Sequence, residues 1–269
     1  MGIDIEESHF YTSALATAHF LKNQAPDCSA YVIGAHGLLN ALYDAGITFN
    51  DVNPDYVVVG ETTGYNYEMI LKATELIHKG AKLIATNSDL TGPSERGIIP
   101  ACRALVSPIE MATGKQAYFI GKPNPLMMRT GLKKLGVHSE DSVMIGDRMD
   151  TDIVAGVETG LETVLVLTGV STRENIKKFS YQPHYILNGI GDLVPGYKRY
   201  APRAERSQRK EINHNKKSEE ARAFSDFCFS TRFWAIKNRP AYQKHAVIIK
   251  IMAEWVGFEP TRGLTPLTI

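Results

Sequence analysis

Apolar and polar positions along residues 1–197 follow a repeating order, in which a short apolar run is followed by an amphipathic stretch. The runs are rich in Val, Ile and Leu and predict strands at 31–34, 56–60, 82–87, 118–121, 143–145, 163–169 and 183–187. Apolar residues at helical spacing predict helices at 8–24, 37–45, 66–79, 100–111, 125–135 and about 150–160. Because strands alternate with helices at short spacing, the pattern indicates βαβ units and a parallel sheet, and the predicted fold class is α/β.

Turn and cap residues support these boundaries. Gly46, Gly80 and Gly136 each follow a predicted helix, where glycine adopts the left-handed conformation that commonly ends helices. The run at 163–169 is apolar without interruption, as expected of a strand that is buried on both faces. Ser171-Thr-Arg-Glu174 has the form of a capping box and predicts the start of a short helix.

The repeating pattern stops near Lys198, and the charge balance changes there. Residues 1–200 carry 17 Lys and Arg against 22 Asp and Glu, whereas residues 201–269 carry 13 against 7. Residues 201–222 contain little that a core could bury, so we expect them to be disordered. The tail at 198–269 resembles no selected domain, since 255–262 looks like a peptide translated from the complement of a transfer-RNA gene. The alternative is a basic nucleic-acid-binding extension, but its charges are scattered and no binding module is recognisable.

The overall composition is that of an ordinary globular protein, with 43% hydrophobic and 22% charged residues. No apolar run is long enough to span a bilayer, and the acidic first residues do not form a secretory signal. Cys28, Cys102 and Cys228 lie far apart, which argues against a disulfide framework or a zinc site and fits a reducing compartment. We therefore expect a cytoplasmic protein that does not bind membranes.

The candidate chemistry centres on residues 141–156. The predicted strand stops at Gly146 and places Asp147 on an open loop, and a helix begins near Asp150 and Asp152. In parallel sheets, ligands bind beyond the carboxyl ends of strands, where Asp147 is expected. Carboxylates grouped on one loop suit a hard cation such as Mg²⁺. The alternative interpretation is a helix N-cap with solvated acidic residues.

Lys122 is a second charged residue directly after a predicted strand. A lysine at that point can neutralise a phosphate or a carboxylate, although a surface lysine is the more common explanation for a single residue. Its strand precedes the Asp147 strand by one βα unit. Because sequential βα units usually pair side by side, we expect these two strands to be neighbours in one sheet.

Several of these segments resemble the haloacid dehalogenase superfamily of phosphatases. The matching motifs are Gly121-Lys-Pro-x-Pro, Ile145-Gly-Asp-x-x-x-Thr-Asp152-Ile-x-Ala-Gly and Thr163-Val-Leu-Val-Leu-x-Gly-Val-Ser171. Further segments are similar to the NagD-type, or 4-nitrophenylphosphatase-like, branch: Phe10–Ala18, Asp51–Thr62 and Ile84–Asp89. The resemblance covers about residues 5–195.

The resemblance implies a Rossmann-like parallel-sheet core with an inserted α/β cap. Residues 1–27 would be a remnant of the N-terminal half of the core, 28–115 the cap, and 116–197 the C-terminal half of the core. Residues 198–269 would be the basic tail.

The resemblance also implies roles for individual residues. Lys122 would steady the phosphate and the charge of the nucleophile, and Asp147 would be a Mg²⁺ ligand. Asp152 would be the second acidic residue of the same motif, with a catalytic role near the metal or behind its ligand. Three cap residues would face the substrate together with Lys122: Thr86, Asn87 and Asp89. For these three, a strand end with an Asx turn is an equal alternative.

One feature of the family pattern is missing. The family's nucleophile is an aspartate in an Asp-x-Asp-Gly motif after a buried strand, and the sequence contains no such motif. Asp4-Ile-Glu6 does not replace it, because no strand precedes it and no glycine follows. We expect a chain that lacks the N-terminal half of the core, which would leave a sheet edge bare and invite association.

Two hypotheses follow. The first is a Mg²⁺-dependent phosphatase of small phosphomonoesters, such as nucleoside monophosphates or sugar phosphates, impaired by the loss of the nucleophile. The second is an inactive, truncated or misread product that at most binds phosphate or metal weakly. Neither hypothesis includes a nucleic-acid or membrane partner, and homo-oligomer formation stays open.

Overall fold

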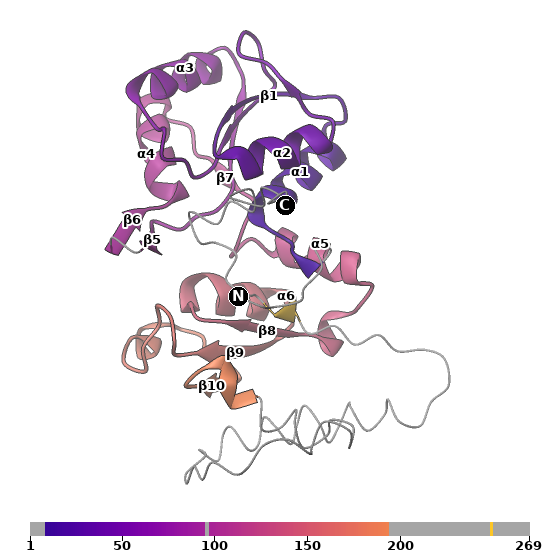
Figure 1. Cartoon of the computed structure of the whole chain (residues 1–269), viewed down its shortest axis with the longest axis vertical. Helices are drawn as coiled ribbons and strands as arrows, with labels where there is room; N and C mark the ends of the chain where they lie inside the picture. The colour runs from indigo at the N-terminus through magenta and orange to yellow at the C-terminus, as the bar shows by residue number, and fades with distance from the viewer. Residues whose placement is uncertain (1–8, 95–96, 194–247, 250–269) are drawn as a thin grey trace, which may run out of the picture. The chain divides into compact units, whose positions relative to one another are not determined.

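The computed structural model describes residues 9–94, 97–193 and 248–249, which divide into two compact units (Figure 1). The first unit contains the described residues up to Gly131, and the second begins at Leu132. Helix α5 (Pro125–Leu135) contains the boundary. The tail predicted at 198–269 lies outside the described residues, apart from Ile248–Ile249.

The first unit is built on a parallel five-stranded sheet. Its strands, in spatial order, are β2 (Thr48–Phe49), β1 (Ser29–Ile33), β3 (Tyr56–Val59), β4 (Lys82–Ala85) and β7 (Tyr118–Phe119). Every residue of the central strand β3 is buried, as expected where helices cover both faces of a parallel sheet.

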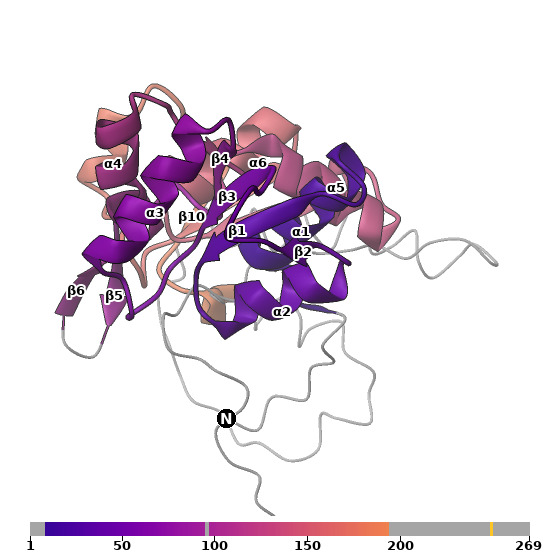
Figure 2. The ribbon, with the colours of Figure 1, turned by 90° about the horizontal axis from the view of Figure 1, so that it is seen from above.

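Two pairs of helices cover this sheet (Figure 2). The helices α1 (Ser13–Gln24) and α2 (His36–Asp44) pack on one face, and α3 (Tyr67–His78) and α4 (Cys102–Thr113) on the other. Local sequence explains two of the helix starts. The Thr12 hydroxyl accepts the Leu15 N–H at 3.2 Å, and the Asn66 side chain accepts the Met69 N–H at 3.0 Å.

A hairpin that the sequence did not predict follows β4. Strands β5 (Thr91–Ser94) and β6 (Gly97–Pro100) pair antiparallel and form a separate two-stranded sheet. The turn-forming residues Gly92, Pro93 and Ser94 predict a loop in this segment. The pairing arises from cross-strand hydrogen bonds, which the composition of one strand does not reveal.

The second unit holds a parallel four-stranded sheet. Its strands, in spatial order, are β10 (Tyr185–Leu187), β9 (Glu162–Val166), β8 (Val143–Gly146) and β11 (Ile248–Ile249). Short helical segments accompany it: η2 (Ser139–Asp141), the π-helical turn η3 (Met149–Ile153), α6 (Val154–Thr159), η4 (Asn175–Lys178) and η5 (Ile190–Leu193). Strand β9 contributes to apolar clusters on both faces, through Leu165 on one and Val164 and Val166 on the other.

The two units show how the described residues pack, and the expected domain boundaries stay a prediction. Helix α1 packs against α2 and the five-stranded sheet, so the segment expected as a remnant of the core joins the first unit. Strand β7 pairs with β4, whereas β8 lies in the other sheet. The expectation that the Lys122 and Asp147 strands are neighbours in one sheet was therefore wrong, because β7 finds its hydrogen-bonding partner at the edge of the first sheet.

The predicted capping box is also corrected. Thr172 and Asn175 exchange reciprocal hydrogen bonds between side chain and backbone at 2.9 and 3.3 Å, so the cap lies one residue later than expected. The hydroxyl of Ser171 instead accepts the N–H of Met149 at 3.1 Å. Tertiary contact redirects Ser171 toward the loop after β8.

Cys28 and Cys102 are both buried and carry free thiols. None of the helices in the described part of the chain has the length and apolar character that crossing a bilayer requires.

Tyr65 links the segment before α3 to α4. Its hydroxyl donates a hydrogen bond to the carbonyl of Leu105. Burial, with a smaller contribution from the nearby Cys102 thiol, raises the pKa of Tyr65 from 10.0 to about 12. Because the folded state retains the phenolic proton to higher pH than the unfolded chain, the contribution of Tyr65 to stability is present below pH 10 and is lost as pH rises toward 12.

We predict that Tyr65→Phe lowers the free energy of unfolding by about 0.5–1.5 kcal/mol below pH 10, because it removes one hydrogen bond. The variant should also lose less stability than the wild type between pH 10 and 12, since its ring has no proton to release. Urea unfolding across this range measures both effects. Tyr67→Phe is the matched control, because the Tyr67 side chain is 70% exposed. Equal pH slopes in the wild type and Tyr65→Phe would contradict the assignment.

Candidate active site

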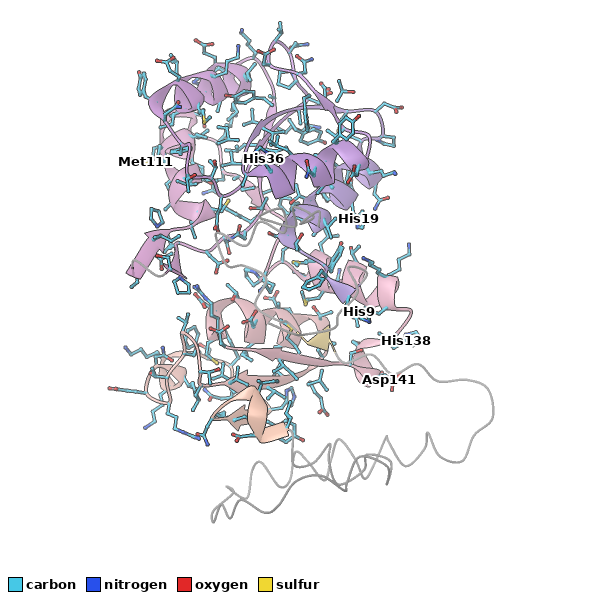
Figure 3. The ribbon with its side chains drawn as sticks, in the orientation of Figure 1. His9, His19, His36, Met111, His138 and Asp141 are labelled. Atoms are coloured by element: carbon cyan, nitrogen blue, oxygen red, sulfur yellow. The ribbon has the colours of Figure 1, made fainter. Side chains whose placement is uncertain are left out.

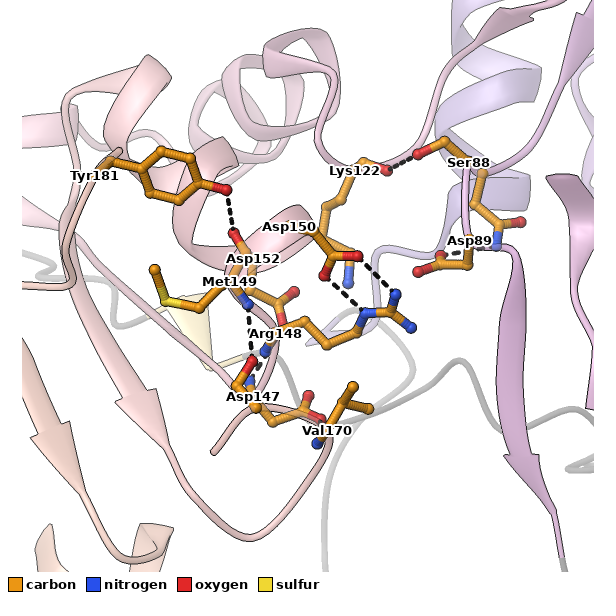
Figure 4. A network of polar contacts seen from close by, with 12 residues as sticks. Ser88, Asp89, Lys122, Asp147, Arg148, Met149, Asp150, Asp152, Val170 and Tyr181 are labelled. Atoms are coloured by element: carbon orange, nitrogen blue, oxygen red, sulfur yellow. Dashed lines mark hydrogen bonds and ion pairs between the residues drawn. The ribbon is translucent and has the colours of Figure 1, made fainter. Parts of the chain in front are cut away.

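Asp147 stands at the carboxyl end of β8 and is only 4% exposed. Its Oδ2 atom accepts the N–H of Val170 at 2.9 Å, and its backbone carbonyl accepts the N–H of Ser171 at 3.0 Å (Figure 4). Both donors lie on the segment that follows β9. Two adjacent parallel strands therefore hold the carboxylate from their shared carboxyl edge, as the sequence predicted for Asp147.

Asp152 organises the loop from within and is fully buried. Its Oδ2 atom accepts the N–H groups of Asp147 at 3.1 Å and Arg148 at 3.2 Å. An N-cap accepts N–H groups two or three residues later in the chain, whereas Asp152 accepts from residues four and five positions earlier. The N-cap interpretation therefore does not describe Asp152, which instead satisfies the backbone of the loop that carries Asp147.

Two glycines make room for these carboxylates. A Cβ atom at Gly146 would overlap the side chain of Asp152, and one at Gly169 would overlap Oδ2 of Asp147. From the sequence, Gly146 was predicted only as a strand end, and no separate function was predicted for Gly169. The need for glycine at position 169 cannot be read from its neighbours in sequence, because the residue it makes room for is Asp147, which follows β8.

Asp150, the third acid of this loop, has a different environment. It pairs with Arg148 through two contacts, Nε to Oδ1 at 3.1 Å and Nη2 to Oδ2 at 2.9 Å, and its side chain is 53% exposed. The loop is fastened on its other side by the Tyr181 hydroxyl, which donates to the Met149 carbonyl at 2.9 Å (Figure 4). Of the acids grouped by the sequence, Asp147 and Asp152 are thus buried and interact, while Asp150 balances an arginine.

A second polar centre lies in the first unit, at the carboxyl ends of β4 and β7. The Gly121 N–H donates to the carbonyl of Thr86 at 2.7 Å, and the Ser88 hydroxyl donates to the carbonyl of Lys122 at 3.3 Å. Lys122 is only 3% exposed. The backbone of Lys122 is therefore joined to the segment that contains Thr86, Asn87 and Asp89, which the sequence assigned separately to the cap.

The side chains of this centre form one hydrogen-bonded network. The Thr86 hydroxyl donates to the Asn87 Oδ1 atom at 2.8 Å, and the Asn87 amide nitrogen donates to Glu61 Oε1 at 3.1 Å and Asp89 Oδ2 at 2.9 Å. Glu61 also accepts the Cys102 N–H at 3.3 Å. Sequence reasoning missed Glu61, although its position directly after β3 is the signal that could have identified it.

The side chains of this network are buried. Thr86, Asn87 and Asp89 are each at most 6% exposed. Burial also raises the pKa of the adjacent Cys102 thiol, so this cysteine stays protonated at neutral pH and does not supply a thiolate nucleophile.

Histidines do not contribute a metal cluster in the described residues. In the first unit, His9, His19 and His36 come from separate segments, and the His19 ring stacks on Tyr11 (Figure 3). Within residues 9–94, 97–193 and 248–249, no three His, Cys, Asp or Glu side chains gather as a metal-binding group. A cation bound by the described residues would therefore have few carboxylate ligands.

Comparison with known proteins identifies the family of the chain. The sequence model of the HAD-hydrolase-like family matches residues 119–193. A dihydroxyacetone phosphatase of Corynebacterium glutamicum is 50% identical over 193 residues, which are 72% of this chain and 70% of that protein. The ribonucleotide monophosphatase NagD of Escherichia coli is 46% identical over 192 residues, or 71% of this chain and 75% of that protein.

The chain belongs to the NagD-type phosphatases of the haloacid dehalogenase superfamily. The solved structure of NagD from E. coli K-12 superimposes with a TM-score of 0.65 at 47% identity, covering 70% of this chain and 74% of that one. The resemblance inferred from the motifs is confirmed, and so is the α/β fold class.

In this NagD-type chain, Asp152→Ala tests how the Asp147 loop is held. The substitution removes the acceptor of two backbone N–H groups, so we expect a loss of roughly 2 kcal/mol or more in the free energy of unfolding. Asp150→Ala in the same loop breaks only a partly exposed ion pair and should cost less than about 1 kcal/mol. Urea titration followed by circular dichroism measures both. Equal losses would show that Asp152 does not organise the loop.

Proposed function

We propose that the chain acts on small phosphomonoesters as a Mg²⁺-dependent phosphatase. The observation that carries the proposal is Asp147, a buried carboxylate that accepts the backbone N–H of Val170 at the carboxyl edge of a parallel sheet, in a chain 46–50% identical to named phosphatases. Phosphoryl transfer depends mainly on positioning and charge neutralisation, and a rigid, oriented carboxylate suits that task.

Asp147 is the proposed Mg²⁺ ligand. Its Oδ2 atom is engaged by the Val170 N–H, and a carboxylate has acceptor capacity beyond one such bond. Mg²⁺ commonly uses one or two carboxylates and completes its coordination with water, so the small donor set is compatible with it. When bound, the ion would neutralise negative charge on a phosphate. Asp152 would act as a positioning residue, because its carboxylate holds the backbone N–H of Asp147.

Lys122 is the proposed phosphate-binding cation of the first unit. An ammonium group at the carboxyl end of a parallel strand can pair with a phosphate oxygen, and its low exposure would strengthen that interaction. The backbone of Lys122 is fastened through Ser88, which keeps the start of the side chain in place.

Thr86, Asn87 and Asp89 are proposed to determine substrate preference indirectly. Both hydrogens of the Asn87 amide are already donated, one to Glu61 and one to Asp89, so the amide has no donor left for a substrate. We infer that the three residues shape the loop beside Lys122 rather than bind the substrate themselves. The names of the two relatives support nucleoside monophosphates and small sugar or triose phosphates as the substrate class.

A second candidate function is binding of phosphate or Mg²⁺ without turnover. It is favoured by one observation, that the sequence contains no Asp-x-Asp-Gly motif to supply the attacking carboxylate. The two candidates share their binding residues and differ only in catalysis.

A cytoplasmic location is part of the proposal and rests on the free thiols of Cys28 and Cys102. A small phosphorylated substrate is the partner we propose, while formation of a homo-oligomer stays a prediction.

Mg²⁺ binding is the first test. We expect Asp147→Asn to weaken Mg²⁺ binding to the full chain at least about tenfold, because a neutral amide replaces the proposed ligand charge; tenfold corresponds to about 1.4 kcal/mol. Asp150→Asn makes the same chemical change in the same loop and should leave the affinity unchanged. Isothermal titration calorimetry measures both. Equal affinities in Asp147→Asn and the wild type would exclude Asp147 as the ligand.

Phosphate binding and turnover separate the two candidate functions. With inorganic phosphate, Lys122→Gln should bind at least about tenfold more weakly than the wild type, whereas the exposed Lys82→Gln should not. Hydrolysis of 4-nitrophenyl phosphate that requires Mg²⁺ and disappears in Asp147→Asn supports the phosphatase. Binding without hydrolysis supports the second candidate, and the absence of both contradicts each of them.

A further inference from the structure

The four-stranded sheet of the second unit ends in a strand contributed from far along the chain. Strand β11 (Ile248–Ile249), the short yellow arrow in Figure 1, pairs parallel with β8. Ile248 lies opposite Met144 and Ile249 opposite Ile145. The other strands, β8, β9 and β10, follow one another within residues 143–187. This pairing attaches the tail to the ordered sheet, which the periodicity of the tail did not predict.

The neighbour of β11 is the strand that carries Asp147. Strand β8 pairs with β9 along all four of its residues, from Val143 to Gly146. Its opposite edge pairs with β11. Parallel strands direct backbone N–H and C=O groups to both sides, so β8 needs a partner on each edge to satisfy its hydrogen bonds. An uncovered edge of this kind is a template for any extended chain.

The local sequence around β11 is suited to that edge. Residues 246–252 read Ala-Val-Ile-Ile-Lys-Ile-Met, an aliphatic and β-branched run within a tail that is otherwise rich in charged and polar residues. β-branched residues favour the extended conformation, and apolar runs are typical of strands in parallel sheets. The two segments, β8 and residues 246–252, are thus complementary in both backbone and composition.

We propose that the β8 edge is a strand-binding surface whose occupant is this chain's own segment Ile248–Ile249. The partner that fits it is an extended apolar strand running parallel to β8, recognised through main-chain hydrogen bonds, which is the chemistry of β-strand addition. The pairing covers the edge of β8 and holds the strand from which the Asp147 loop emerges. The inference does not depend on catalysis, because it concerns the sheet and not the reaction.

Hydrogen exchange in the full chain tests the pairing. Ile248→Pro/Ile249→Pro removes both backbone N–H groups of β11, so β8 amides that face β11 should exchange at least about tenfold faster. Amides of β3 in the first unit should be unaffected. The matched control is Ala221→Pro/Ala223→Pro in the same tail, which should exchange as the wild type does. A synthetic peptide of residues 246–252 should restore protection of β8 in the variant. Unchanged β8 exchange in Ile248→Pro/Ile249→Pro would overturn the proposal.

A cross-link identifies the occupant even if the proline variant unfolds the second unit. Met144→Cys/Ile248→Cys places two thiols on paired residues, and mild oxidation should join them within one chain, giving a monomer in which mass spectrometry finds the peptides of residues 144 and 248 linked by a disulfide. Met144→Cys/Leu264→Cys is the control and should not form this product. A cross-linked dimer would assign the edge to a second copy and contradict the proposed occupant. No cross-link would refute the pairing.

Discussion

Both units depend on the same constraint, which is that all strands of a parallel sheet end on one side. In the first unit, this rule gathers Glu61, the Thr86–Asp89 segment and Lys122 after β3, β4 and β7. In the second unit, it brings Asp147 after β8 next to Val170 and Ser171 after β9. Polar side chains and loop backbone groups accumulate at these edges because the strands bury mainly apolar residues and satisfy their own backbone hydrogen bonds.

At the edge of the second sheet, backbone groups carry most of the organisation. Asp147 is oriented by N–H donors, and Oδ2 of the buried Asp152 accepts two N–H groups of the loop. Such an arrangement leaves little space, which is why Gly146 and Gly169 occupy the positions where a Cβ atom would overlap the two acids. Hydrogen bonds within the protein thus fix the position of the charge, and preorganised charge favours phosphoryl transfer.

The two polar centres differ in the partners of their carboxylates. Around Asn87, two carboxylates accept the two hydrogens of one amide within the first unit. In the Asp147 loop, the partly exposed Asp150 forms an ion pair with Arg148. The charge of Asp150 is therefore balanced separately from that of the buried Asp147. Membership of the NagD-type phosphatases is consistent with both centres, and Thr86, Asn87 and Asp89 are each at most 6% exposed.

Local sequence determined the order and type of most elements, the position of Asp147 at a strand end and the family motifs, because helical and strand periodicity are properties of near neighbours along the chain. Tertiary structure alone decided that β7 pairs with β4, that Glu61 reaches Asn87, that Gly169 must accommodate Asp147, and that Ile248–Ile249 completes the sheet beside β8. Each of these depends on residues far apart in sequence, and no local pattern specifies which strand edge or side chain a distant segment will meet. The hairpin β5–β6 was missed for the same reason, since Gly92, Pro93 and Ser94 in β5 are turn-forming residues and the two short strands are defined only by their pairing.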